Sequence, residues 1–289
     1  MAITVQSTAS TVFAAASSVV ITKPTGLAVG DLMIAAVGCT GTNVTADVAS
    51  GWTNITLNGS GGTMSIRLQY KVAVSGDVSA SNFTFTGSGT SVATIAGAML
   101  RVTGYASTVI ATLSDSDSDG TSGTGGTFTS TLTPLAADSL VIFVYGAYGT
   151  NGAVPSVTSF SSTPSLTYTT LLSTGIDSGT TDPAFGVGYG IYSGTTQFTQ
   201  YIGNVSRSQS SHLGLLYIVT PQVDVTGSNN LLSADADFFA PAASSGVVGT
   251  TALLSTDADL FSASGFSNSP TQWTNETKNT TTWTNEPKI

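Results

Sequence analysis

Few side chains in this sequence could act as an acid, a base or a nucleophile. The one histidine, His212, stands in SQSSHLGLL directly before an apolar run, and the one cysteine, Cys39, ends another apolar run. Nucleophilic Ser-His-Asp and Cys-His centres both need a histidine as the base. A place just before an apolar strand predicts instead that His212 closes a turn. The place of Cys39 favours a small buried thiol, so neither residue predicts a nucleophilic centre.

The carboxylates offer little more for catalysis. The only glutamates, Glu276 and Glu286, lie in near-identical phrases near the C-terminus, and a catalytic pair of carboxylates has no need to be part of a repeat. Cys/His zinc spacing and a phosphate-binding Gly-Lys-Ser/Thr loop are both absent from the sequence. We therefore expect no enzyme, no catalytic residue and no cofactor.

One acidic stretch, SDSDSDGTSGTGGT at residues 114–127, has the spacing of a metal site. Asp115, Asp117 and Asp119 match the first half of a calcium loop, in which alternate carboxylates reach one cation. The twelfth position would be Gly126 rather than a bidentate glutamate, and no helical pattern flanks the stretch. The sequence favours a solvated acidic loop, with a calcium site at the three aspartates as the alternative.

Composition limits the partners of the chain. Only 8% of the 289 residues are charged, the net charge is −9, and seven lysines and arginines are spread along the whole length. Binding of nucleic acid through its phosphates is excluded by this balance. Neither a signal peptide nor an apolar run of membrane-spanning length occurs, so we expect a chain made in the cytoplasm that does not cross a membrane. A surface with few charges suits packing against copies or a larger assembly, because little charge must be desolvated.

Periodicity indicates the elements that would position these residues. In SIRLQYKVA, residues 65–73, apolar and polar residues alternate, which predicts a strand with one face on a core and one in solvent. Three continuous apolar runs, Leu32–Gly38, Ser139–Ala147 and Leu213–Pro221, predict strands covered on both faces. No segment combines helical spacing with helix caps. Residues 1–222 are therefore predicted to form an all-β, two-sheet antiparallel jelly-roll-like sandwich.

The entry to the first apolar run has its own signature. Within KPTGLAVGDLMIAAVG, residues 23–38, the pair Gly30-Asp31 stands immediately before Leu32. This order predicts a tight corner that delivers the chain into a buried central strand, with a turn at Pro24 before it.

Two short repeats distinguish the C-terminal part. LLSADADFFA at residues 231–240 returns as LLSTDADLFS at 253–262, and Trp-Thr-Asn-Glu occurs at Trp273 and again at Trp283. The repeats divide the region into a tandem segment, 223–268, and a tail, 269–289. Each copy is too short to bury its own apolar residues, so we expect it to pack on its twin, on the sandwich or on a neighbouring subunit, and we expect the tail tryptophans to be docking anchors. The predicted assembly contacts are Leu231, Leu232, Phe238, Phe239, Leu253, Leu254, Phe261, Trp273, Asn275, Trp283 and Asn285.

The phrases quoted above, with Gly51-Trp52-Thr53, LQYKVA and FTFTG, resemble a family of jelly-roll-like proteins encoded among the structural genes of tailed bacteriophages. The resemblance covers residues 15–105 well and the rest up to 222 loosely. DADFFAP and the Trp-Thr-Asn-Glu tail also resemble segments of phage structural proteins, although the second repeat copy lacks the proline and the tail has Glu where Gln is usual.

This resemblance implies a virion protein without enzymatic activity. It would be an exposed accessory subunit, either a head decoration or fibre or a tail-associated fibre or adaptor, held in the particle by its C-terminal repeats. Its partners would be other capsid or tail proteins and further copies of itself, a trimer being one option. The alternative is a carbohydrate-binding module or adhesin that binds host-surface glycans.

Overall fold

The protein is described here by a computed structural model of the chain. It falls into two units, Met1–Val223 and Asp224–Ile289, and each is described by itself. The residues that the structure describes are 2–60, 62–106, 114–149, 154–177, 182–222, and the strands 231–233, 251–255 and 260–263.

The described part of the first unit consists almost wholly of β-strands, with one five-residue helix, α1 (Ser75–Ser79). Its strands are β1 (Thr4–Ala14), β2 (Ser18–Thr22), β3 (Leu32–Thr42), β4 (Thr45–Ala46), β5 (Thr53–Ser60), β6 (Met64–Val72), β7 (Asn82–Ser88), β8 (Ser91–Thr103), β9 (Ser114–Asp119), β10 (Gly123–Thr129), β11 (Ser139–Tyr148), β12 (Val157–Thr163), β13 (Thr169–Gly175), β14 (Ala184–Tyr192), β15 (Gln200–Gln209) and β16 (Ser211–Val219). No helix among the described residues is long and apolar enough to cross a membrane.

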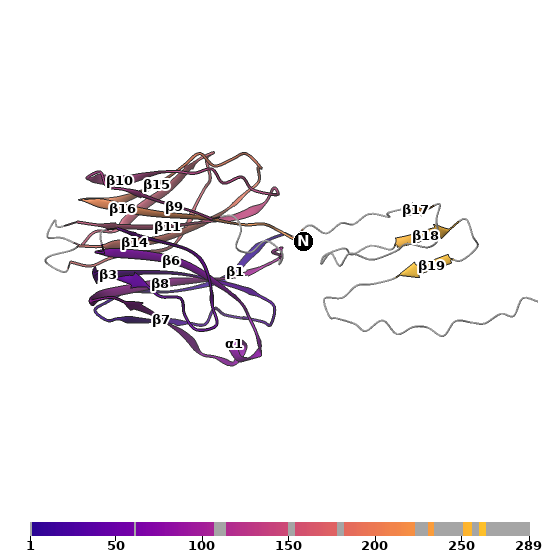
Figure 1. Cartoon of the computed structure of the whole chain (residues 1–289), viewed down its shortest axis with the longest axis horizontal. Helices are drawn as coiled ribbons and strands as arrows, with labels where there is room; N and C mark the ends of the chain where they lie inside the picture. The colour runs from indigo at the N-terminus through magenta and orange to yellow at the C-terminus, as the bar shows by residue number, and fades with distance from the viewer. Residues whose placement is uncertain are drawn as a thin grey trace, which may run out of the picture. The chain divides into compact units, whose positions relative to one another are not determined.

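The strands form four antiparallel sheets, which Figure 1 shows as stacked layers. The two inner layers are five-stranded sheets in the orders β1-β8-β3-β6-β5 and β13-β14-β11-β16-β9. The outer layers are three-stranded sheets, β2-β7-β4 on one side and β10-β15-β12 on the other. The predicted all-β antiparallel sandwich is thus confirmed, and the structure adds the two outer sheets.

The apolar runs form strands with both faces buried, as the sequence predicted. Along β3, Leu32 and Ile34 belong to the core between the two inner sheets, whereas Met33 and Ala35 belong to the core beneath β2-β7-β4. The strand β11 divides in the same way, since Leu140 and Ile142 belong to the inner core, whereas Val141 and Phe143 belong to the core beneath the other outer sheet. A strand whose successive side chains enter two different cores must be apolar throughout, because side chains alternate between faces.

The two halves of this unit repeat one topology. The strand order β1-β8-β3-β6-β5 becomes β9-β16-β11-β14-β13 when every number rises by eight, and β2-β7-β4 becomes β10-β15-β12. Each half is therefore an eight-stranded jelly roll, and the halves pack through their five-stranded sheets. Equivalent strand pairs meet across this interface, because β1 lies against β13 and β5 lies against β9.

Glycines at equivalent places in the two halves admit side chains of the opposite half. A Cβ on Gly38 in β3 would lie 2.5 Å from the ring of Phe185 in β14. Gly146, at the matching place in β11, faces β6, where the added Cβ would lie 2.9 Å from Ile66 and 2.7 Å from Met64. The register of β3 on β6 and of β11 on β14 gives Ile66 and Phe185 the same place in their halves. The interface therefore interlocks in the same manner twice.

The strands β3 and β11 also begin in a similar way. Gly30 has φ of 90° just before Asp31, whose carboxylate accepts a hydrogen bond from the N–H of Ala28 at 2.7 Å. In the second half Asp138 has φ of 58°, and the hydroxyl of Ser139 donates to the carbonyl of Ala136 at 2.7 Å. The predicted corner at Gly30-Asp31 is confirmed, because a left-handed residue turns the chain and a polar side chain closes the turn before the strand is buried.

Two predictions about exposed polar residues were wrong. Most of the polar face of residues 65–73 is shielded from solvent: Arg67 is 9% exposed and Gln69 is fully buried, because β4 and the segment after it cover them, and only Lys71 is partly exposed. The guanidinium of Arg67 donates to the carbonyl of Ala46 at 2.5 Å, and the side chain of Gln69 bonds the backbone of Asp47 and Ala49. The acidic stretch 114–127 is also not a loop, since it forms β9 and most of β10.

The described part of the second unit is a three-stranded sheet in the order β17-β18-β19, comprising β17 (Leu231–Ser233), β18 (Thr251–Ser255) and β19 (Leu260–Ala263). Two of its strands, β17 and β18, contain the Leu-Leu-Ser residues of the two copies, and these residues pair with each other. The twin copies thus meet through their backbones, one of the three contacts considered from the sequence.

The interlocking glycines give a test of the interface between the halves. We expect Gly38→Ala and Gly146→Ala each to lower the free energy of unfolding by about 1–3 kcal/mol, because the new methyl group must displace a buried side chain. Chemical denaturation measures this change. Gly120→Ala is the control, since its Cβ would meet no atom within 4 Å. Equal stability of all three variants would contradict the packing described here.

Candidate functional site

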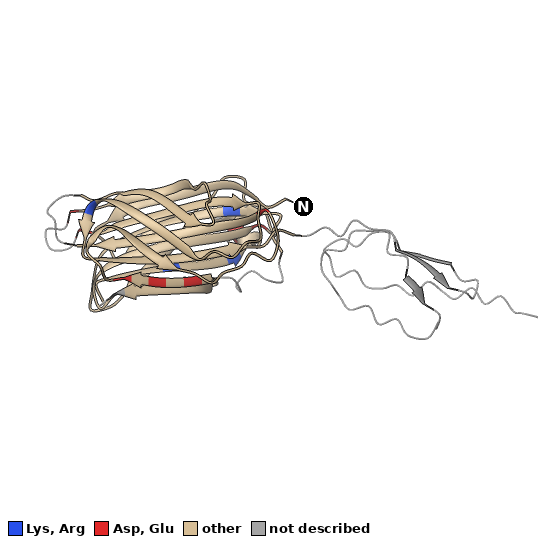
Figure 2. Cartoon of the chain, turned by 90° about the horizontal axis from the view of Figure 1, so that it is seen from above, with Lys and Arg blue, Asp and Glu red and all other residues tan. Residues whose placement is uncertain are grey.

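The acidic strand β9 and the buried residues beside it contain most of the side chains to which the sequence assigned possible chemistry. β9 is an edge strand of an inner sheet, paired only with β16 among the described strands, and the chain then turns into β10 of the outer sheet. Figure 2 shows the aspartates as red bands along one edge strand of the body. The strand therefore lies at a corner between two sheets.

The carboxylates of β9 hold this corner together. Asp117 accepts hydrogen bonds from the N–H of Thr129 at 3.0 Å and from its hydroxyl at 3.2 Å. Asp119 accepts from the N–H and hydroxyl of Thr121 at 2.8 and 2.6 Å, and from the N–H of Thr127 at 3.2 Å. Since β10 pairs with β15 on its other side, these bonds satisfy N–H groups along its outer edge.

The geometry of an extended strand does not gather three carboxylates around one cation. Alternate residues of a strand are roughly 6.6 Å apart, whereas calcium ligands converge to roughly 2.4 Å from the ion. The third carboxylate, Asp115, accepts from the N–H of Ser116 at 2.8 Å. Among the residues that the structure describes, no group of three metal-binding side chains occurs. The alternate spacing thus reflects strand periodicity, and the bonds of Asp117 and Asp119 account for two of the carboxylates.

Hydrogen bonding also sets the charge state of Asp119. Burial alone would raise the pKa of this carboxyl group, but the bonds from Thr121 and Thr127 outweigh that effect and lower the pKa. The nearby His212 acts in the same direction. Asp119 is therefore held as a carboxylate that can accept three hydrogen bonds.

His212 does not close a turn, contrary to the prediction. It lies inside β16, directly opposite Asp119 in the register, and it is fully buried. Its Nδ1 is 2.5 Å from the hydroxyl of Tyr145, and the two rings are nearly parallel with centroids 5.9 Å apart. Gly126 makes room for the imidazole, since a Cβ there would lie 2.5 Å from the Cβ of His212. The sequence offered no signal for this pair, because its members are 67 positions apart.

The buried pair is suited to structure rather than to proton transfer with a solvent-borne substrate. Burial lowers the pKa of His212, and the charge of Asp119 and the backbone of Thr121 oppose this only in part. Burial disfavours the charged form of Tyr145 too, and it therefore raises the pKa of the phenol. A neutral imidazole bonded to a neutral phenol therefore gives Nδ1 of His212 and the hydroxyl of Tyr145 a hydrogen-bond partner without burying a charge.

Cys39 is the second residue considered as a nucleophile. It is fully buried beneath the outer sheet β2-β7-β4, and burial raises the pKa of its thiol to about 12. The predicted buried thiol is confirmed. Such a thiol carries almost no thiolate near neutral pH, and it is therefore a poor nucleophile.

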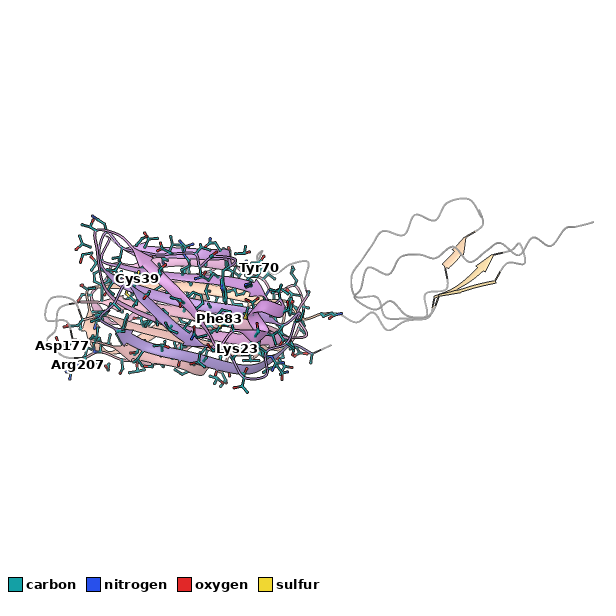
Figure 3. All side chains as sticks on the ribbon, turned by 90° about the horizontal axis from the view of Figure 1, so that it is seen from below. Lys23, Cys39, Tyr70, Phe83, Asp177 and Arg207 are labelled. Carbon is teal, nitrogen blue, oxygen red and sulfur yellow. The ribbon has the colours of Figure 1, made fainter. Side chains whose placement is uncertain are left out.

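Ion pairs tie the loops of the first half to its strands. Arg101 in β8 bonds Asp31 at 2.6 Å, and Lys71 in β6 bonds Asp77 of α1 at 2.6 Å. Lys23 donates to the carbonyl of Val78 within that helix. Figure 3 views the body from the side of β7, with Lys23 labelled. The charged side chains of this half thus connect its loops and helix to its strands, a role that sequence reasoning did not assign to them.

Trp52, the aromatic residue of the Gly-Trp-Thr phrase, also has a structural role in the first half. Trp52 is 9% exposed and packs edge-to-face on Phe85 and Phe83, with ring centroids 5.1 and 5.9 Å away. Figure 3 labels Phe83 on this outer side. Trp52 therefore covers the apolar layer beneath β7 and is not a surface anchor.

The predicted assembly contacts are placed only in part. Leu231, Leu232, Leu253, Leu254 and Phe261 lie in described strands of the second unit, where their backbones pair. The others lie outside the described residues, namely Phe238, Phe239, Trp273, Asn275, Trp283 and Asn285.

Comparison of the chain with models of protein families, with curated proteins and with solved structures finds no match.

The buried histidine makes stability depend on pH in a defined window. His212 has a folded pKa below its ordinary 6.5, so the unfolded chain binds the proton more readily. Stability is therefore full above about pH 6.5 and falls as the pH drops towards the folded pKa. We expect denaturant unfolding to give a lower free energy of unfolding at about pH 5 than at about pH 7.5. His212→Gln should flatten this slope, since the chain has no other histidine; a wild-type curve already flat over this range would contradict the assignment.

The corner bonds predict unequal effects of removing the three aspartates. Asp117→Ala and Asp119→Ala should each cost about 1 kcal/mol of unfolding free energy, because backbone and hydroxyl donors lose their acceptor. Asp115→Ala should change it little, since Asp115 bonds only the adjacent N–H in the described contacts. Thermal melts with EDTA or calcium should coincide for the wild-type chain. A melting temperature that falls with EDTA and returns with calcium would instead identify a structural calcium site.

Proposed function

We propose that the chain is a non-enzymatic structural protein of a tailed-phage particle. It would be an exposed accessory subunit, either a head decoration or fibre or a tail-associated fibre or adaptor, attached through its C-terminal repeats. The observation that carries this proposal is where the phage-like phrases fall in the fold. The phrases within residues 15–105 all lie at structural positions of the first jelly roll: the corner at Gly30-Asp31, the strand β3, the buried Trp52, and the strands β6 and β7.

The treatment of charge in the body supports the same role. The ion pairs and carboxylate bonds described above hold strands and loops together, so few charges remain to be desolvated when the protein docks. The large apolar side chains exposed on the described surface are scattered valines, leucines and one isoleucine. A body whose surface carries few charges can pack closely in an assembly without a catalytic site of its own.

A glycan-binding module or adhesin is the second candidate, since host recognition is compatible with a place in a particle. Sugar platforms commonly combine carboxylates with exposed aromatic rings. Here the bonds of Asp117 and Asp119 are internal, and the described exposed apolar residues are aliphatic. We therefore place structural assembly first and treat glycan binding as an outcome to be measured.

Mass spectrometry of purified particles from a phage that encodes this chain tests the proposal. We expect the intact chain at a fixed ratio to the major capsid protein. Hundreds of copies would place it on the head, and a few copies would place it at the neck or tail. Its absence from infectious particles would refute the proposal, and a glycan array with the purified chain would then test the second candidate.

The tail tryptophans provide a variant for the same particles. We expect Trp273→Ala with Trp283→Ala to lower incorporation by at least tenfold while leaving the first unit folded, because each buried ring contributes a few kcal/mol to docking. Far-UV circular dichroism of the purified variant checks the fold. The single change Trp52→Ala is the opposite control, since it should destabilise the body without touching the tail. Normal incorporation of the double variant would show that the tail is not the anchor.

A further inference from the structure

The C-terminal sheet pairs the two copies of one phrase with each other. Leu231 lies opposite Leu253, Leu232 opposite Leu254 and Ser233 opposite Ser255, with the strands parallel. Each residue thus faces the residue that occupies the same place in the other copy. The second copy then continues through residues 256–259 into β19, which pairs antiparallel with β18.

The chain segments that connect β18 to its two neighbouring strands differ greatly in length. β19 follows β18 after a short hairpin connection, so that pairing is local. β17 reaches β18 only through residues 234–250, as a parallel pair requires a long crossover. The β17–β18 pair also extends over three residues only, so little binding free energy ties β17 to the β18 of its own chain.

The residues in the pair are uncharged and contain no proline, so no side chain on this edge repels another strand. A strand held by a long connection and a short pairing can leave its own sheet and occupy the same place in another copy. The same contacts then form between chains instead of within one, which makes this exchange a low-cost route to oligomers.

We propose that β17 of one copy pairs with β18 of a second copy of this chain, in the parallel register seen within the chain. The exchange deepens the assembly role proposed above, because it assigns the joining of copies to the Leu-Leu-Ser phrases. The contact is heterologous, so it closes when the last chain in a ring gives its β17 to the first, as in a trimer, or when two chains exchange reciprocally.

Cysteine crosslinking of the full-length chain distinguishes exchange from pairing within a chain. Ser233→Cys and Ser255→Cys are made as separate variants, refolded together and oxidised. Exchange places the two cysteines side by side in different chains, so we expect a covalent dimer from the mixture and none from either variant alone. The wild-type chain is the blank, because Cys39 is buried and its thiol pKa is about 12.

The hairpin supplies a matched control. Ala252 lies opposite Ser262 across β18 and β19, and the local hairpin should not exchange. A mixture of Ala252→Cys and Ser262→Cys chains should therefore give no covalent dimer. The proposal is overturned if the two mixtures crosslink equally, or if the Ser233→Cys and Ser255→Cys mixture gives no dimer. Neither result bears on whether the chain is found in particles, so failure of this inference and failure of the proposed function can be told apart.

Discussion

Two apolar sheet faces packed against each other hold the first unit together, and the other layers follow from that contact. The inner core contains residues from β3, β6 and β8 on one side and from β11, β14 and β16 on the other. Burial of each large aliphatic or aromatic side chain in this core contributes about 1.5–3 kcal/mol, so the interface contributes much of the stability of the unit. Close approach requires room for the larger side chains, and Gly38 and Gly146 provide it at equivalent places.

The outer sheets are a consequence of the same strands. Because β3 and β11 are apolar on both faces, an inner sheet alone would expose a second apolar face to water. β2-β7-β4 and β10-β15-β12 cover those faces and create the two outer cores. The last strand of each half has a glycine at the same place, Gly97 and Gly214, where a Cβ would approach Ile21 and Phe128 of the covering sheet within 2.8 Å. The same packing device therefore serves all three cores.

Charge has a limited and local use in this architecture. In the first half, ion pairs fix the loops at Asp31 and Asp77, and in the second half, carboxylates of β9 fix the corner to β10. The halves have the same topology but differ in one buried side chain. The register of β11 on β16 places His212 where the register of β3 on β8 places Ile95 in the first half. The fold thus accommodates at this point either a polar pair, joined through Nδ1 of His212 and the hydroxyl of Tyr145, or an aliphatic side chain.

The sequence by itself determined the class of fold, because strand periodicity and long apolar runs are local properties. It also determined the corner at Gly30-Asp31 and the buried state of Cys39, since each depends on neighbouring residues. Only the tertiary structure decided that Arg67 and Gln69 are buried, because the strand that covers them is remote in sequence. It also decided that the acidic stretch is a strand, since Asp117 and Asp119 accept hydrogen bonds from N–H groups of β10 and of the turn before it. The pairing of His212 with Tyr145 was likewise decided only by the tertiary structure. Residues of similar local pattern acquire different roles because burial and hydrogen-bond partners are set by the strands that fold over them.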